Sequence, residues 1–288
     1  MNSINFVFFG ASDAVTIVLE RLKTKGFVPG LIVTTPDMPV GRKHILTPPP
    51  AKVWGDQNKI SVLQPKKLDE EFTQKLKAQP WDLFIVATYG TIIPQAILDI
   101  PHKGAVNIHP SLLPLYRGPS PIKSQILANE EFIGTTIMLM DEKMDHGPIL
   151  AQEEIPFGRK EGELVQTHPE IEKIIWEKSA DLLIEILPEW LKGSVAAQEQ
   201  DHGQATFTRF FKKEDGLIDL KDDPRKNYRK YLAYQPWPGT FFFAEKDGIQ
   251  TRVLIRKARF ENNLFVIETV LPEGKKEITY EKFLLSSV

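Results

Sequence analysis

Runs of consecutive apolar residues alternate with amphipathic segments through the first half of the chain. The runs that predict buried strands lie at residues 4–9, 29–35, 59–63, 82–88 and 104–108. Residues 15–22 and 69–76 place apolar side chains at helical spacing, and Asp69 stands near the start of the second helix. Buried strands that alternate with amphipathic helices are typical of a parallel sheet covered on both faces. We therefore predict an α/β fold with a Rossmann-like, mostly parallel sheet and helices on both faces.

The pattern changes in the second half of the chain. Residues 135–140 predict one more strand, and residues 171–191 predict a single long helix. After a helix-like segment at 225–234, four short strand-like runs follow at 240–244, 252–258, 264–270 and 277–280. Short strands at close spacing predict a small β-rich, OB-like module. The predicted organisation is one domain over residues 1–192, a polar linker over 193–205 and a β-barrel-like domain over 206–288.

Composition narrows the class of protein. The chain has 288 residues, enough for about two domains, and 42% of them are hydrophobic, which supports a packed core. It has no cysteine, which excludes a disulfide scaffold, a thiolate nucleophile and an iron–sulfur cluster. No apolar run reaches the ~18 residues that a membrane span needs, and no signal peptide is visible. We therefore expect a cytoplasmic protein.

Charge is distributed unevenly along the chain, although the net charge is only −2. Residues 1–206 carry 20 basic and 26 acidic side chains, whereas residues 207–288 carry 16 and 12. A basic C-terminal third on an acidic body suggests a polyanionic partner for that third, and a random scatter over a solvated face is the alternative. The candidates for phosphate contacts on one short helical stretch are Arg225, Lys226, Arg229 and Lys230.

The turn after the first strand argues against a dinucleotide site. It consists of Gly10-Ala11-Ser12-Asp13, which has one glycine where the G-x-G-x-x-G fingerprint needs three. The six histidines show no H-E-x-x-H or similar ligand spacing, so we predict no metal site. Nicotinamide, flavin and metal chemistry are therefore not expected.

Three polar residues near strand ends are the strongest candidates for chemistry. Asn107 and His109 have i, i+2 spacing at the end of a strand, so both side chains point the same way and could hold a developing oxyanion. Asp145 follows the next strand, and a carboxylate beside an imidazole can fix its tautomer or take a proton through water. The trio, without a serine or cysteine nucleophile, suggests direct acyl transfer to a group of the substrate. A lone histidine or aspartate at a strand end is often structural, so spacing alone leaves both interpretations open.

Two long segments resemble a known enzyme family. They are NIHPSLLPLYRGPSPI at residues 107–122 and GTTIMLMDEKMDHGPIL at residues 134–150. Shorter matches are FFGASD at 8–13, PDMPVGRK at 36–43 and YQPWPGTFF at 234–242. With these motifs the chain resembles the 10-formyltetrahydrofolate-dependent formyltransferases, and most of all those that act on methionyl-tRNA. The resemblance covers nearly the whole chain.

The resemblance implies an enzyme that formylates the α-amino group of methionyl-initiator tRNA for translation initiation, with 10-formyltetrahydrofolate as co-substrate. It implies that Asn107, His109 and Asp145 are catalytic. The residues that it assigns to the folate site are Val86, Ala87, Tyr89, Gly90, Ser111, Leu112, Leu113, Pro114, Met140 and Asp141. The partners expected are initiator methionyl-tRNA and 10-formyltetrahydrofolate, with no membrane and no metal, and the enzyme is expected to be a monomer.

The loop at residues 36–50 corresponds to one that contacts the tRNA acceptor end. It contains five prolines, which should stiffen it, and the basic residues matched to tRNA contact are Arg42 and Lys43. Two features depart from the family. His146 replaces the usual threonine after Asp145, where it lies near the site or simply faces solvent, and the C-terminal module is shorter between Leu264 and Glu277.

Two other functions stay open from the sequence. A formyltransferase for a nucleotide-linked amino sugar is the main alternative, because such enzymes can carry a similar second module. Glycinamide ribonucleotide enzymes generally lack that module and are disfavoured. A folate- or RNA-binding protein without activity is the third hypothesis, against which the intact Asn107, His109 and Asp145 argue.

Overall fold

The chain forms two compact units, each built from several segments of the sequence. The computed structural model describes residues 4–41, 44–246 and 248–286. The first unit comprises Met1–Pro119, Gly134–Ile155 and Lys173–Phe207, and the second comprises Ser120–Ile133, Pro156–Glu172 and Thr208–Val288. Because the segments of the two units interleave along the chain, the domain boundaries at residues 192 and 205 stay a prediction.

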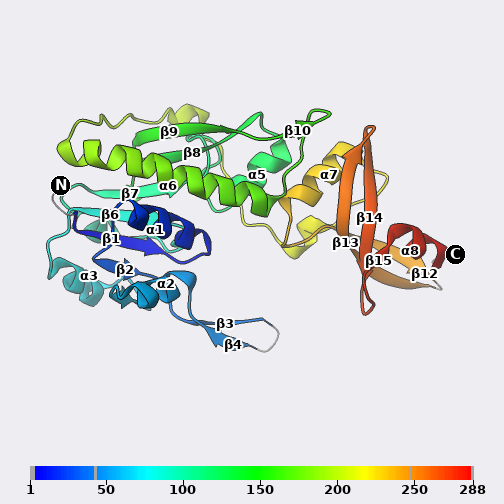
Figure 1. Cartoon of the computed structure of the whole chain (residues 1–288), viewed down its shortest axis with the longest axis horizontal. Helices are drawn as coiled ribbons and strands as arrows, with labels where there is room; N and C mark the ends of the chain where they lie inside the picture. The colour runs from blue at the N-terminus through cyan, green and yellow to red at the C-terminus, as the bar shows by residue number, and fades with distance from the viewer. Residues whose placement is uncertain (1–3, 42–43, 247, 287–288) are drawn as a thin grey trace. The chain divides into compact units, whose positions relative to one another are not determined.

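A seven-stranded sheet forms the centre of the first unit (Figure 1). Its strands, in spatial order, are β5 (Val62–Leu63), β2 (Leu31–Val33), β1 (Phe6–Gly10), β6 (Leu83–Ala87), β7 (Ala105–His109), β8 (Phe132–Leu139) and β9 (Ile149–Pro156). From β5 to β7 neighbouring strands are parallel, and β8 runs antiparallel to β7. The mostly parallel sheet predicted from the apolar runs is confirmed.

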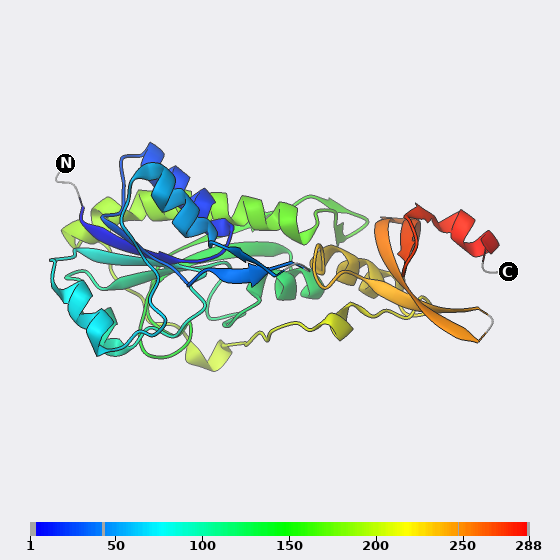
Figure 2. The same ribbon diagram turned by 90° about the horizontal axis from the view of Figure 1, so that it is seen from below.

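Helices cover both faces of this sheet, as Figure 2 shows with α1, α2 and α6 on one side of the strands and α3 on the other. The helices of this unit are α1 (Ala14–Thr24), α2 (Pro50–Asn58), α3 (Glu70–Lys77), α4 (Gln95–Leu98), and most of α6 (His168–Lys192). Phe6 and Phe8 of β1 pack in the cluster with α1, α2 and α6, whereas Val7 and Phe9 pack with α3 and α4. Both faces of the central strands are therefore apolar, because both are buried.

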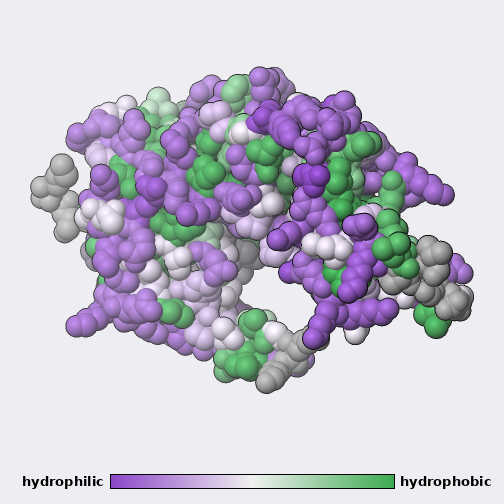
Figure 3. All heavy atoms as spheres, turned by 45° about the vertical axis from the view of Figure 1, so that its right-hand side comes forward, coloured by the Kyte–Doolittle hydropathy of each residue, from purple (hydrophilic) through white to green (hydrophobic). Residues whose placement is uncertain are grey.

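The predicted loop at residues 36–50 contains a short hairpin, β3 (Met38–Val40) and β4 (Ile45–Thr47). Its base is held by Asp37, whose carboxylate accepts hydrogen bonds from Gln64 Nε2 at 2.7 Å and Lys52 Nζ at 3.0 Å. These two hydrogen bonds lower the pKa of Asp37. The exposed apolar side chains on the hairpin are Met38, Val40, Ile45 and Leu46. Figure 3 shows apolar spheres gathered at the lower edge of that view, where the hairpin lies.

The second unit contains the predicted β-rich module, an antiparallel sheet in the order β12-β13-β14-β15. Its strands are β12 (Phe241–Lys246), β13 (Ile249–Glu261), β14 (Leu264–Pro272) and β15 (Ile278–Thr279). The other elements of the unit are α5 (Pro121–Ala128), the hairpin β10 (Arg159–Lys160) and β11 (Glu163–Leu164), η2 (Lys213–Gly216), α7 (Pro224–Ala233) and α8 (Tyr280–Ser286). Tyr228 of α7 stacks on Phe260 of β13 with ring centroids 5.5 Å apart. The β-rich module is confirmed, and β12 and β15 form the two edges of its sheet.

A buried carboxylate joins the β10–β11 hairpin to helix α7. The side chain of Glu163 is 1% exposed, and its oxygens accept hydrogen bonds from Arg229 Nε at 2.6 Å and Arg225 Nη1 at 2.9 Å. Burial alone would raise the pKa of Glu163, but the hydrogen bonds from Arg229 and Arg225 outweigh it and the pKa lies below its ordinary value. Two of the four basic residues assigned to phosphate contact are thus bound to a buried carboxylate of the same unit.

Within the described ranges, no helix is both long enough and apolar enough to cross a membrane. The longest helix, α6, has 25 residues, but charged side chains recur along it. That pattern fits its position in the first unit, where Trp176 and Leu183 are buried against the sheet.

Replacing Glu163 by glutamine tests the ion-pair cluster. The change leaves two guanidinium groups beside a neutral amide, so we expect the free energy of unfolding to fall by about 3 kcal/mol near neutral pH. The pKa of Glu163 in the folded protein lies below the ordinary 4.5, so its stabilisation is present above that pH and is lost as the pH falls through the lowered value. Urea unfolding near neutral and at acid pH should therefore show a difference between the two proteins that shrinks in acid.

The exposed Glu281 of α8 offers a matched control, and Glu281→Gln should leave the unfolding curve unchanged. An unaltered free energy of unfolding in the Glu163→Gln protein would show that the cluster contributes nothing to stability.

Candidate active site

Strand β7 presents two of the predicted catalytic side chains on one face. Val106 and Ile108 belong to the core cluster under α1 and α6, so the alternation of the strand turns Asn107 and His109 to the opposite face. His109 is the last residue of β7 and is 4% exposed. The side-chain amide of Asn107 is half-buried and has no hydrogen-bond partner among the described residues. An amide donor is therefore available beside the imidazole.

The imidazole of His109 lies between two acceptors. Its Nε2 lies 3.0 Å from the carbonyl oxygen of Tyr116, and its Nδ1 lies 3.5 Å from Oδ1 of Asp145. Because a carbonyl oxygen only accepts, Nε2 carries a proton. The distance to Asp145 is at the outer limit of a hydrogen bond, so the carboxylate lies beside the ring without a tight hydrogen bond to it. A second proton on Nδ1 would point at the carboxylate.

The structure brings His109 and Asp145 together by a route that the sequence did not indicate. We expected Asp145 at the same sheet edge because it follows a strand, but β8 is antiparallel and its last residue, Leu139, pairs with Val106 near the start of β7. Residues 140–148 then turn back, and the backbone of Asp145 takes a φ of 51° at the turn. The Gly118 backbone N–H donates to Asp145 Oδ2 at 2.7 Å. The carboxylate is thus oriented by the backbone of another segment.

Gly147 allows this turn to close. A Cβ atom at this position would lie well inside van der Waals contact of the Leu139 carbonyl oxygen, which belongs to the backbone and cannot swing away. The turn continues into β9, and Leu139 N–H donates to the Pro148 carbonyl at 2.8 Å. A side chain larger than hydrogen at residue 147 would force the turn apart.

Two residues that the sequence did not indicate hold the same turn. Gln200 Nε2 donates to the backbone carbonyls of Asp145 at 3.1 Å and of Gly147 at 2.7 Å. Gln200 Oε1 accepts in turn from the buried guanidinium of Arg117, from Nη2 at 2.6 Å. Gln200 lies in the stretch predicted to be a linker, where Gln198 pairs with Ile149 as an isolated β-bridge. Polar residues in a polar stretch carry no sequence signal for burial.

His146 also belongs to this cluster. Its ring stacks on that of His202, at the start of the short helix η1 (His202–Gln204), with centroids 4.0 Å apart and planes 6° from parallel. His146 Nδ1 lies 2.7 Å from Asp141 Oδ2, and His202 Nδ1 accepts from Arg117 Nη2 at 2.9 Å. The departure from threonine at residue 146 therefore places an imidazole in a stacked pair beside the candidate site.

The predicted folate residues of β6 and the following turn are close to Met140. Val86 and Tyr89 are buried in the cluster on the α3 face of the sheet, and Met140 packs against that cluster. Burial raises the pKa of Tyr89 to about 12, so its phenol is neutral at physiological pH. Ala87 is buried in the cluster on the opposite face of the sheet, and Gly90 is exposed with a φ of 74°. The predicted Asp141 is already paired with His146, as described above.

The predicted folate stretch Ser111–Pro114 is pinned from within the unit. Ser111 Oγ donates to the Leu115 carbonyl at 2.7 Å, and the Leu113 N–H donates to Thr136 Oγ1 at 3.1 Å. Ser111 and Leu113 are buried, whereas Leu112 and Pro114 are partly exposed. A ligand would meet Leu112 and Pro114, and the other two would support them.

The basic residues predicted to contact tRNA fall into two groups, one outside the described residues and one on α7. Arg42 and Lys43 lie outside the described residues. Lys226 Nζ lies 2.7 Å from Asp222 Oδ2 on the exposed surface of α7, and Lys230 Nζ donates to the Leu217 carbonyl at 3.0 Å. Burial lowers the pKa of Lys230. With Arg225 and Arg229 bound to Glu163, all four residues of the helical stretch have partners within the second unit.

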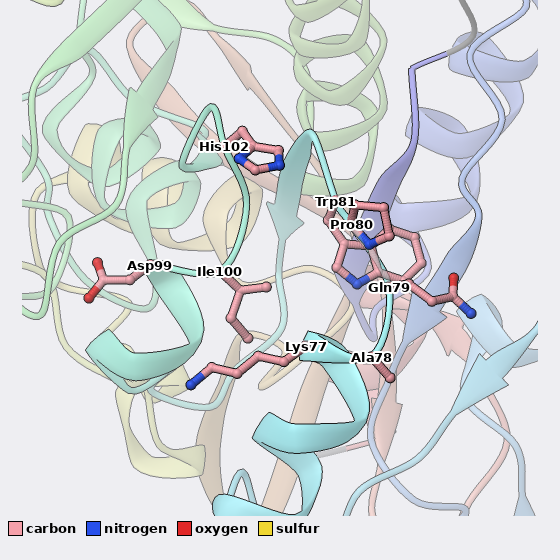
Figure 4. Close-up of a pocket in the computed structure, with 8 residues that line it drawn as sticks. All are labelled: Lys77, Ala78, Gln79, Pro80, Trp81, Asp99, Ile100 and His102. Atoms are coloured by element: carbon pink, nitrogen blue, oxygen red, sulfur yellow. The ribbon is translucent and has the colours of Figure 1, made fainter.

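A hollow of ≈ 480 Å³ lies elsewhere in the first unit (Figure 4). Its lining residues are Lys77, Ala78, Gln79, Pro80, Trp81, Asp99, Ile100 and His102. They precede β6 and β7, so the hollow lies at the amino ends of these strands, whereas His109 lies at a carboxyl end. Ligands of open α/β sheets bind outside the carboxyl ends of the strands, so the hollow is not the candidate site.

Comparison with known proteins supplies the family context. A family model described as formyl transferase matches residues 1–176 of this chain. A methionyl-tRNA formyltransferase from Chloroflexus aggregans is 42% identical over 243 residues, which cover 83% of this chain and 76% of the relative. One from Desulfotalea psychrophila is 34% identical over 307 residues, which cover 98% of this chain and 92% of the relative.

Solved structures share the fold at low sequence identity. A methionyl-tRNA formyltransferase from Clostridium thermocellum superposes with a TM-score of 0.62 and 18% identity, covering 96% of this chain and 99% of that one. A sugar N-formyltransferase from Shewanella sp. reaches 0.65 at 18% identity, covering 89% and 98%. HypX from Aquifex aeolicus, solved with tetrahydrofolic acid, reaches 0.67 at 17% identity, covering 98% of this chain and 47% of that one.

Gly147→Ala tests the steric constraint on the turn. Because the clash is with a backbone carbonyl, we expect the free energy of unfolding to fall by about 1–3 kcal/mol, as measured by urea unfolding. Gly203→Ala is the control, since a Cβ atom there meets only the side-chain oxygen of Asp201, at 3.2 Å. Equal stability of the two variants would show that the turn has room for a methyl group.

Proposed function

Because this chain belongs to the formyl transferase family, we propose that it transfers a formyl group from 10-formyltetrahydrofolate to the α-amino group of methionyl-initiator tRNA. The product would be N-formylmethionyl-tRNA for translation initiation. The observation that carries the proposal is the identity of 34–42% to methionyl-tRNA formyltransferases over most of the chain. Residues 207–288, which contain the β12–β15 sheet, support it, because they hold 16 basic and 12 acidic side chains.

The proposed reaction forms a C–N bond to the methionyl amine and breaks the bond between the formyl carbon and N10 of the folate. The amine loses a proton, and N10 gains one. Negative charge grows on the formyl oxygen, where Asn107 and His109 can donate hydrogen bonds. Each well-aimed donor of this kind contributes about 2.7–4 kcal/mol to lowering the barrier. The amide of Asn107 suits this role because the described part of the chain offers it no other hydrogen-bond partner.

His109 must change a hydrogen bond to act in this way. Its Nε2–H is directed at the Tyr116 carbonyl, so donation to a formyl oxygen requires that this hydrogen be shared or released. Asp145 lies on the other side of the ring, where it can stabilise the imidazolium or accept the amine proton through water. We therefore assign Asn107 and His109 to the oxyanion, and Asp145 to proton transfer and to orienting His109.

The residues that contact the folate are part of the same proposal. Val86 and Tyr89 are buried in an apolar cluster, and Met140, Leu112 and Pro114 offer partly exposed surface. The turn after β6 has positive φ at Thr88 and Gly90, and Gly90 is exposed, so its backbone groups could bind a polar ring edge. These features fit a planar heterocycle with hydrogen-bonding edges, as a pterin is.

The tRNA contacts are proposed on different grounds in the two units. The β3–β4 hairpin, with its exposed apolar side chains, is the proposed contact with the acceptor end, and Arg42 and Lys43 follow β3 in the sequence. In the second unit Arg225 and Arg229 are tied to Glu163, so we assign them a supporting role and expect phosphate contacts from exposed cations. We further propose that the enzyme acts in the cytoplasm as a monomer.

An amino-sugar substrate is the alternative function. The structure of a sugar N-formyltransferase from Shewanella sp. shares this fold with a TM-score of 0.65. The structure of an N-formyltransferase from Helicobacter canadensis, which was solved with folinic acid and dTDP-3-aminofucose, shares it with a TM-score of 0.64. Their identities to this chain are 18% and 14%, which speak for the fold alone. The sequence relatives at twice that identity favour methionyl-tRNA.

A direct competition assay tests the choice of acceptor. The purified chain is supplied with 10-formyltetrahydrofolate and with methionyl-initiator tRNA, a dTDP-linked amino sugar, or both. We expect formylation of the methionyl-tRNA and none of the amino sugar. Formylation of the amino sugar alone would overturn the proposed acceptor while leaving the formyl donor unchanged.

Asp145→Asn tests the proposed proton-transfer role. The amide keeps the shape of the side chain but removes its charge, so we expect kcat to fall by about 10²–10⁴-fold with unfolding unchanged. Glu142→Gln on the same turn is exposed and should retain full activity. If Asp145→Asn keeps a kcat like that of Glu142→Gln, the carboxylate has no part in the reaction.

A further inference from the structure

We propose that Gln200, held by the buried Arg117, is a positioning residue that fixes where the carboxylate of Asp145 lies relative to His109. The inference rests on the proposed function, because it concerns the same site. Gln200 is 5% exposed and lies 55 residues beyond Asp145 in the chain. The hydrogen bonds from the Gln200 side chain to the turn go to backbone carbonyls of the turn. We therefore assign Gln200 an effect on the reaction through Asp145, and no contact with the substrate.

Four hydrogen bonds fix the amide of Gln200 in one orientation. Nε2 donates to the carbonyls of Asp145 at 3.1 Å and Gly147 at 2.7 Å. Oε1 accepts from Arg117 Nε at 3.2 Å and Nη2 at 2.6 Å. A guanidinium only donates and a carbonyl only accepts, so the reversed amide would lose all four bonds. Arg117 thus selects the orientation in which Gln200 can hold the turn.

The turn needs such support because its backbone is strained. Asp145 has a φ of 51°, in the left-handed region that non-glycine residues rarely adopt and that the surroundings must enforce. Gly118 N–H holds the carboxylate of Asp145, and Gln200 holds its carbonyl. Arg117 and Gly118 are adjacent in the chain. One short segment after β7 therefore supplies the hydrogen bond to the Asp145 carboxylate and the hydrogen bonds that orient Gln200.

The segment that carries Gln200 is itself anchored on both sides. Gln198 exchanges two backbone hydrogen bonds with Ile149, at 2.7 and 2.8 Å. Further along, the Thr206 carbonyl accepts from the Arg117 backbone N–H at 2.9 Å. Gln200 therefore stands on a fixed strand-like segment, although the sequence around it is polar and was predicted to be a linker.

Small shifts of Asp145 should matter for the rate. Its Oδ1 is already 3.5 Å from His109 Nδ1, so further displacement would remove the pairing. A misplacement of about 1 Å by a change away from the reacting atoms can cost about 10²-fold in rate. Loss of Gln200 should accordingly lower kcat and leave the KM values for both substrates little changed.

Gln200→Glu is the sharpest variant. It is isosteric and keeps the acceptors for Arg117, but it replaces both N–H donors by an oxygen facing two carbonyl oxygens. We expect kcat for methionyl-tRNA formylation to fall about 10²-fold, with little change in either KM. Gln198→Glu is the matched control, because that side chain is exposed on the same segment, and it should keep wild-type kcat.

Amide hydrogen exchange supplies a readout that needs no substrate. The Gly118 N–H donates to Asp145 Oδ2, so its exchange should quicken in Gln200→Glu as the turn shifts. The Gln198 N–H, bonded to Ile149, reports whether the segment itself stays folded and should remain protected. Lower kcat, faster exchange at Gly118 and unchanged exchange at Gln198 together support the proposal.

Two results would overturn it. A wild-type kcat in Gln200→Glu would show that Asp145 needs no such support. Loss of protection at Gln198 together with loss of activity would show that Gln200 only holds the segment folded. If the wild-type chain formylates no methionyl-tRNA, the proposed function fails, but exchange at Gly118 still decides whether Gln200 positions the carboxylate, and unchanged exchange there rejects the inference.

Discussion

The left-handed turn at Asp145 is the constraint on which the candidate site depends. Strand β8 runs antiparallel to β7, so its end points away from His109 and the chain must reverse within a few residues to bring a carboxylate back. The reversal needs a positive φ at Asp145 and a residue without a Cβ atom at 147. Hydrogen bonds from Gly118 and Gln200 then fix the side-chain carboxylate and the backbone carbonyl of Asp145, respectively.

The two units use buried charge in contrasting ways. In the second unit a buried Glu163 is neutralised by Arg225 and Arg229, and the outcome is a joint between a hairpin and a helix. In the first unit the buried Arg117 donates hydrogen bonds to the uncharged amide of Gln200 and to the ring nitrogen of His202, beside the candidate site. The guanidinium of Arg117 thereby orients Gln200, which in turn holds the backbone of Asp145.

Much of the fold could be predicted because its strands are apolar on both faces. The run FVFFG of β1 is buried throughout, and Asp69 caps α3 by accepting from the Phe72 N–H, as its position indicated. The β3–β4 hairpin could not be predicted, since its strands are three residues long, contain a proline and expose their apolar side chains. Strand β9 could not be predicted from its sequence either, because ILAQEEIP has neither a long apolar run nor an alternation of apolar and polar residues.

The candidate site could be predicted only where it depends on local spacing. The i, i+2 pair of Asn107 and His109 follows from the alternation of a strand. Gln200 and Arg117 could not be found in this way, because a hydrogen bond between residues 83 apart depends on tertiary structure. Counting charges likewise could not distinguish cations that are free from those, such as Arg229, that a buried carboxylate already binds.

A crystal structure of the chain with 5-formyltetrahydrofolate would test the central claim most directly. The account predicts the pterin against Val86 and Met140, with the formyl group facing the side chains of Asn107 and His109 and with Asp145 still hydrogen-bonded to Gly118. A folate bound instead in the hollow beside Trp81, with Asn107 and His109 far from the formyl group, would contradict it.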